Sequence, residues 1–113
     1  MTTYYRYEDV QYAPPADEDG ERRGQGELHV HLRKYNVLRH TPKGVWIDAH
    51  GSGKFVLETA KKRFAWPTKE EAKASFIARK RRQIAIHQAR IDRANQALNT
   101  ILEKALYAHN LDS

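Results

Sequence analysis

The stretch that decides the fold is PTKEEAKASFIARKRRQIAIHQARIDRANQALNTILEKALYA, residues 67–108. From Lys69 onward it holds no glycine or proline and is rich in alanine, which favours helix throughout. Thr68 suits the N-cap position, and Glu71 three residues later completes a capping box. We therefore predict one continuous helix over residues 67–110, roughly 60 Å long at 1.5 Å per residue. The sequence LNT, residues 98–100, is a position that could host a break in the helix.

One side of this helix is apolar. Ile84, Ile91 and Leu98 follow Ile77 at intervals of seven residues, the spacing of a coiled-coil seam, although polar side chains occupy companion positions. In the first half, Ile77 and Ile84, together with Phe76, are expected to cover the sheet. In the second half, the seam is expected to pair with another helix, either in a partner or in a second copy of this chain as a homodimer.

Arginines lie on the opposite side of the helix, within one arc of the helical wheel. None of them has an acidic residue four positions away, whereas solvated helix faces usually interleave glutamate with arginine. Ile86 is the one large apolar residue in the middle of this arc. The arginine row predicts an anionic partner, either protein carboxylates or phosphates, and an ordinary solvated face is the alternative. The row consists of Arg79, Arg82, Arg90 and Arg93.

The first 66 residues are predicted to form an antiparallel sheet. Residues 2–12 are rich in tyrosine and suit a strand, and residues 27–40 alternate in part. Between them, residues 13–26 carry prolines, glycines and charges with almost nothing to bury, which predicts a mobile acidic loop. Its acids are Asp17, Glu18, Asp19 and Glu21. Further short strands are predicted at 45–50, 54–58 and 63–66, with turns at 41–44 and 51–53.

These elements predict an α+β fold in a single domain. An N-terminal antiparallel β-meander of three to five strands occupies residues 1–66, and one long C-terminal α-helix follows it. The length of 113 residues suits one small domain with a modest core.

Composition limits the function classes. Lysine and arginine number 20 against 14 acids, a net charge of +6 that favours an anionic partner. The absence of cysteine excludes disulfides and thiolate metal sites. No run of about 18 apolar residues occurs, and the N-terminus has no apolar signal core, so we expect a soluble cytoplasmic protein with no membrane partner.

The sequence gives little support for a catalytic or metal site. His29 and His31 share one strand face and, with His40 or His50, could bind zinc, but nothing else in the sequence supports such a site, and ordinary surface histidines are the better interpretation. GSGK, residues 51–54, matches part of a phosphate loop without its full spacing, and a hairpin turn is the better interpretation. Asp48 and His50 form an acid–base pair without a visible nucleophile. We expect no enzyme activity, no cofactor and no metal.

The aromatic residues divide into two groups. Trp46, Phe55, Phe64 and Trp66 are expected in the core rather than as base-stacking platforms. Tyr5 and Tyr7 share one face of the first strand, and an exposed tyrosine there is expected to act as a partner-binding anchor.

The segments TPKGVWI, KFVL, KKRFAWPTKEEA, SFIARK and RQI, within residues 41–100, resemble a widespread group of small uncharacterised accessory proteins encoded by tailed phages and prophages. The resemblance implies a small, cofactor-free protein that acts inside the infected host cell. It implies no functional residues.

Two hypotheses follow. The first is a phage-encoded interaction protein that binds and inhibits a host protein or ribonucleoprotein complex, as an anti-defence protein and for example an anti-CRISPR. The second is a nucleic-acid-binding accessory protein that contacts phosphates through the arginine row. These hypotheses differ in salt response, because binding to phosphates weakens steeply as salt rises.

Overall fold

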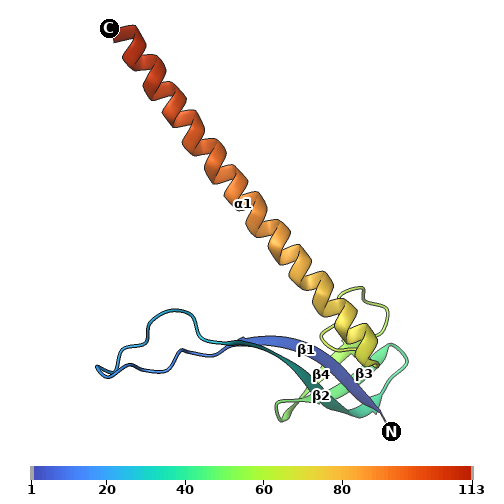
Figure 1. The fold of residues 1–113 in the computed structure, drawn as a ribbon. Helices are drawn as coiled ribbons and strands as arrows, with labels where there is room; N and C mark the ends of the chain where they lie inside the picture. Colours follow the sequence, from blue (N-terminus) through green and yellow to red (C-terminus); the bar gives the residue numbers. More distant parts are fainter. Residues whose placement is uncertain (1, 113) are drawn as a thin grey trace. The chain divides into compact units, whose positions relative to one another are not determined.

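The computed structural model describes residues 2–112, and the side chains of residues 2–106. The fold is α+β, with a four-stranded antiparallel sheet followed by one long C-terminal helix, as predicted (Figure 1). The strands lie in the sheet in chain order, so every connection is a hairpin. The elements are β1 (Thr3–Gln11), β2 (Leu28–His40), β3 (Gly44–Ala49), β4 (Ser52–Leu57) and α1 (Lys69–Asp112).

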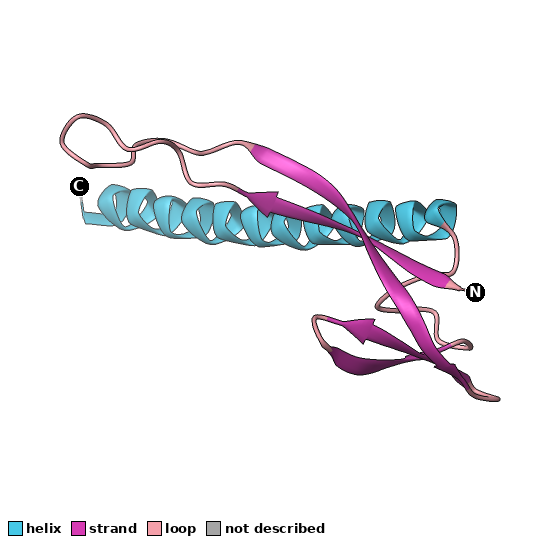
Figure 2. Ribbon diagram, turned by 90° about the horizontal axis from the view of Figure 1, so that it is seen from below, coloured by secondary structure: helices cyan, strands magenta, loops and turns pink. Residues whose placement is uncertain are grey.

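Strands β1 and β2 form a long hairpin whose pairing runs from Thr3↔Asn36 to Gln11↔Leu28, with the acidic loop at its end (Figure 2). The loop is organised by its own side chains. One carboxylate oxygen of Asp17 accepts hydrogen bonds from the backbone N–H groups of Asp19 and Glu21, at 3.0 and 2.8 Å. Arg23 pairs with Asp17 and with Glu21, at 3.4 Å in each case. Two of the four loop acids are thus neutralised within the loop.

The second hairpin turns one residue earlier than predicted. Its central residues are His50 and Gly51, with φ angles of 57° and 81°. Two successive positive φ angles are the mark of a type I′ turn, whose twist matches that of the flanking strands. Residues 52 and 53, predicted to belong to the turn, instead pair with β3 as Ala49↔Ser52 and Asp48↔Gly53.

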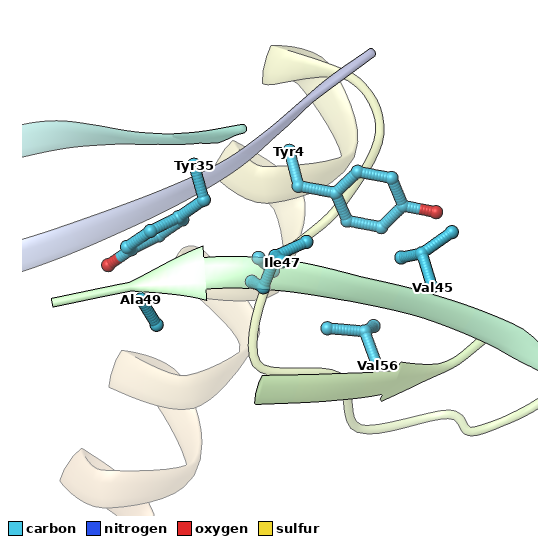
Figure 3. Packing of buried hydrophobic residues seen from close by; sticks show 7 residues of the cluster. Tyr4, Tyr35, Val45, Ile47, Ala49 and Val56 are labelled. Carbon is cyan, nitrogen blue, oxygen red and sulfur yellow. The ribbon is translucent and has the colours of Figure 1, made fainter. Parts of the chain in front are cut away.

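The core lies on one face of the sheet, where Tyr4 and Tyr35 of the first hairpin meet Val45, Ile47 and Val56 of the second (Figure 3). Val45 and Ile47 are fully buried, and burial of such a side chain contributes roughly 1.5–3 kcal/mol. Of the four aromatic residues expected in the core, only Phe64 packs against this cluster. The expected strand at 63–66 is reduced to a single bridge between Trp66 and Tyr5.

Helix α1 begins where the capping box was predicted and continues unbroken through residues 98–100. Thr100 keeps its hydroxyl satisfied inside the helix by donating to the carbonyl of Gln96 at 2.8 Å. The chain divides into two compact units, one ending at Ile77 and one beginning at Ala78. The first turns of α1 belong to the first unit, where Ala72 is buried and the ring of Phe76 lies 6.4 Å from that of Tyr7. Within residues 2–112, no helix is apolar over a span long enough to cross a bilayer.

Candidate functional site

The apolar seam of α1 is open to solvent. Ile84, Ile91 and Leu98 expose 66, 53 and 54% of their surface. The expectation that Ile84 covers the sheet is wrong, because the helix residues packed in the first unit are Ala72 and Phe76, about three and two turns before Ile84. A seam with a residue every 10.5 Å or so is therefore left without cover over this part of α1.

Farther along α1, Ile101, Leu102 and Leu106 are also exposed. They extend the apolar surface by about two turns beyond Leu98. Continuous exposed apolar surface of this kind marks interaction sites on proteins. The second unit thus offers the geometry that helix pairing requires, with knobs at regular intervals along one side.

The arginine row occupies a different side of the same helix. Arg82, Arg90 and Arg93 are exposed, whereas Arg79 is half-buried. Within residues 2–106, the three exposed arginines make no ion pair. The acid nearest to them in sequence, Asp92, accepts a hydrogen bond from the amide of Gln88 at 2.9 Å. Arg82, Arg90 and Arg93 therefore present positive charge that forms no ion pair among the described side chains of the helix.

Ile86 sits at the centre of the arginine row. Arg82 and Arg90 lie four residues before and after it, and Arg79 and Arg93 lie seven residues before and after it. Residues at these spacings share one helix face. Ile86 is nevertheless 47% exposed, so the row combines an apolar centre with a cationic border. A shallow hollow begins at Arg93, the last arginine of the row, and its lining also includes Ala97, Thr100 and Lys104.

Tyr5 and Tyr7 are half-buried and lie in the first unit. The backbone of Tyr5 is hydrogen-bonded to the backbone of Trp66, and the ammonium of Lys69 lies 5.8 Å from the centroid of the Tyr5 ring. The ring of Tyr7 contacts Phe76. Both tyrosines thus help to hold the start of α1, and only part of each ring remains accessible to a partner.

The histidines do not converge on a common point. His29 and His31 stack at 6.1 Å, but His29 bonds Glu27 and His31 bonds the hydroxyl of Tyr12. His40 pairs with Thr2, and the ring of His50 stands edge-on to Tyr35. Among the described side chains, no group of three or more His, Cys, Asp or Glu residues is arranged to hold a metal ion.

One surface was missed by the sequence reasoning. Trp46 and Phe55 are direct partners across β3 and β4, with ring centroids 5.3 Å apart, on the face opposite the core. The signal was present in the sequence, because Val45, Ile47 and Ala49 alternate with Trp46 and predict that it points the other way. Large aromatic side chains usually lie in protein cores, but here the alternation of the strand decides which way Trp46 points.

Comparison of this chain with known protein families, with curated proteins and with solved structures found no match in any of the three.

Proposed function

We propose that this chain is a phage-encoded binding protein, without enzymatic activity, that inhibits a host protein or ribonucleoprotein complex as part of an anti-defence response. The observation that carries the proposal is the helix beyond Ala78, which exposes an apolar seam and a cationic row on separate sides. A helix of this kind is suited to be held by a partner, because the seam residues and Arg82, Arg90 and Arg93 are exposed, and within residues 2–106 these three arginines make no ion pair. The resemblance to phage accessory proteins supplies the cellular setting, an infected host cell.

The exposed Ile86 favours a protein partner for the arginine row. A phosphate backbone contacts cationic side chains but offers nothing apolar at that position. A protein surface that carries an apolar side chain bordered by carboxylates would bury Ile86 and pair with Arg82 and Arg90 together. Burial of an isoleucine side chain contributes roughly 1.5–3 kcal/mol. A protein partner would gain this free energy at Ile86 and a phosphate backbone would not, which favours the protein.

A nucleic-acid-binding accessory protein is the second candidate. The net charge of +6 and the exposed arginines favour it. The two candidates differ in salt dependence, because each phosphate neutralised on duplex DNA contributes a slope of about −0.9 to the plot of log K against log salt. An interface that buries Ile86 should depend less on salt.

The test is affinity capture from host lysate, with and without nuclease, using the wild type and the double variant Arg82→Glu, Arg90→Glu. We expect the captured complex to survive nuclease and to be lost with the double variant, whose fold should be intact because both positions are exposed. The matched control is Lys61→Glu, Lys62→Glu, which makes the same change in net charge at two other exposed positions. Equal loss in both variants would mean that only overall charge matters, and loss on nuclease treatment would decide for the second candidate.

Competition between the acidic loop and the target for the arginines is an alternative, and deletion of the loop tests it. Because Asp17 and Glu21 already pair with Arg23, we expect deletion of residues 15–24 to leave target binding unchanged. Tighter binding by the deletion variant would show that the loop competes with the target.

A further inference from the structure

The outward face of the β3–β4 hairpin is aromatic and apolar, the reverse of the usual pattern for a half-buried sheet. In β3 and β4 the core side is occupied by Val45, Ile47 and Val56. Alternation places Trp46 and Phe55 on the other side, and Phe55 is 37% exposed. Leu38, at the irregularity in β2, and Leu57 border the two rings and are 58 and 40% exposed. We call these four residues the aromatic platform.

Two glycines make the platform flat. A Cβ atom at Gly44 would lie 2.8 Å from the Cζ atom of Phe55, so the phenyl ring occupies the space above that glycine. A Cβ atom at Gly53 would lie 3.5 Å from Cε3 of Trp46, so the indole borders the other bare position. With no side chain at either glycine, the two rings can lie over these positions, where Phe55 is exposed and Trp46 is half-buried.

The platform lies in a basic segment of the chain. Residues 33–63 contain eight lysines and arginines and two acids, a balance of +6 that equals the net charge of the whole protein. The guanidinium of Arg39 lies 5.8 Å from the Trp46 ring. One acid, Asp48, shares the outward face, as the pairing partner of Gly53. Positive charge beside accessible aromatic rings is the combination that single-stranded nucleic acids require, because the backbone is anionic and every base has a flat face that stacks.

We propose that the aromatic platform binds single-stranded nucleic acid, with bases stacked on Trp46 and Phe55 and the backbone held by Arg39. Single strands are favoured over duplexes, because the base faces of a duplex are already stacked on one another. Ring contacts with bases are tolerant of sequence, so the site recognises the single strand itself rather than one order of bases. The inference goes beyond the proposed inhibitor function and is independent of α1, since all of its residues lie in the unit that ends at Ile77.

The experiment uses the full chain and a fluorescently labelled 12-nucleotide oligouridylate, with a duplex of the same length as the comparison. Binding is followed by anisotropy and by quenching of tryptophan emission in a Trp66→Phe background, which leaves Trp46 as the single tryptophan. We expect the single strand to bind more tightly than the duplex and to quench Trp46. We expect Trp46→Ala and Phe55→Ala each to weaken binding by about 5- to 150-fold, the range found for stacked bases.

Charge-matched variants separate the platform from general attraction. Arg39→Glu and Lys104→Glu change the net charge equally, but only Arg39 adjoins Trp46. We expect Arg39→Glu to weaken binding more, Trp46→Phe to retain most of it, and Asp48→Asn to strengthen it. The phenylalanine variant also serves if Trp46→Ala fails to fold. The proposal is overturned if Trp46 is not quenched, if duplex and single strand bind equally, or if Lys104→Glu costs as much as Arg39→Glu. The last two results would mean that the nucleic acid is attracted by net charge alone. Failure to bind the oligouridylate at all would also overturn the proposal and would indicate that the platform binds a protein instead.

Discussion

The hydroxyl of Thr68 accepts a hydrogen bond from the backbone N–H of Glu71 at 3.1 Å and donates one to the carboxylate of the same residue at 2.9 Å. The carbonyl of Thr68 accepts the first intrahelical bond, from the N–H of Ala72, at 3.1 Å. This pair satisfies one of the donors that every helix start leaves free and places a negative charge at the positive end of the helix dipole. It also fixes where the chain leaves the sheet and where α1 begins.

Replacement of Thr68 should therefore destabilise the first unit. We expect Thr68→Ala to lower the free energy of unfolding by about 1 kcal/mol, within the usual range of about 0.5–2 kcal/mol for an N-cap, as measured by urea unfolding. The matched control is Thr100→Ala, whose hydroxyl bonds a helix carbonyl that already has a backbone donor. This control should change stability by less than about 0.5 kcal/mol. Similar losses in the two variants would contradict a capping role.

Tyr35 offers a prediction of the opposite sign. Its hydroxyl is buried in the core and has no hydrogen-bond partner among the described residues. An unsatisfied buried polar group costs roughly 1–3 kcal/mol, so removing it should help. We expect Tyr35→Phe to keep or raise the free energy of unfolding, whereas Ile47→Ala in the same core should lower it by about 2–5 kcal/mol. A clear loss of stability in Tyr35→Phe would show that the hydroxyl is satisfied after all.

The same residue gives an alkaline pH dependence. Burial disfavours the phenolate and raises the pKa of Tyr35 and of Tyr4 above the ordinary value of 10.0. The unfolded chain then loses these protons first as the pH rises, so the contribution of both groups is fully present below pH 10 and is lost as the pH passes through the raised pKa. Urea midpoints between pH 8 and pH 11 should fall at the alkaline end and fall less in Tyr35→Phe. An unchanged alkaline slope in that variant would mean that Tyr35 ionises alike in both states.

The seam predicts self-association. We expect the wild type to sediment as a dimer at micromolar concentration, because pairing would bury Ile84, Ile91 and Leu98. Ile91→Glu should give a monomer, because it places a charge within the apolar contact. Ile86→Glu is the matched control, since it makes the same change on the arginine side of the helix and should leave the dimer intact. If the wild type is a monomer under these conditions, the seam does not mediate self-association and would have to pair with a different protein.

Much of the fold can be predicted from local sequence features, namely helix capping, helix propensity and the alternation of apolar residues in strands. A capping box followed by more than 30 residues without glycine or proline leaves helix as the only stable state, and α1 is continuous as predicted. Strand positions followed from alternation and from the turn residues between them. The exact turn at His50 and Gly51 did not, because which of several glycines takes the positive φ depends on the register of the strands that the turn connects.

The sequence by itself determined the fold class, the start of α1 and the composition of its two faces, because helix periodicity and capping act within a few residues. Only the tertiary structure decided which apolar residues the sheet buries. It buries Ala72 and leaves Ile84 exposed, and it turns Trp46 outward while Tyr4 and Tyr35 fill the core. The physical reason is that burial depends on which surfaces meet in space. A small sheet can bury only one of its own faces and the first turns of one helix. The local sequence pattern does not determine which residue of the helix is the last one to be buried.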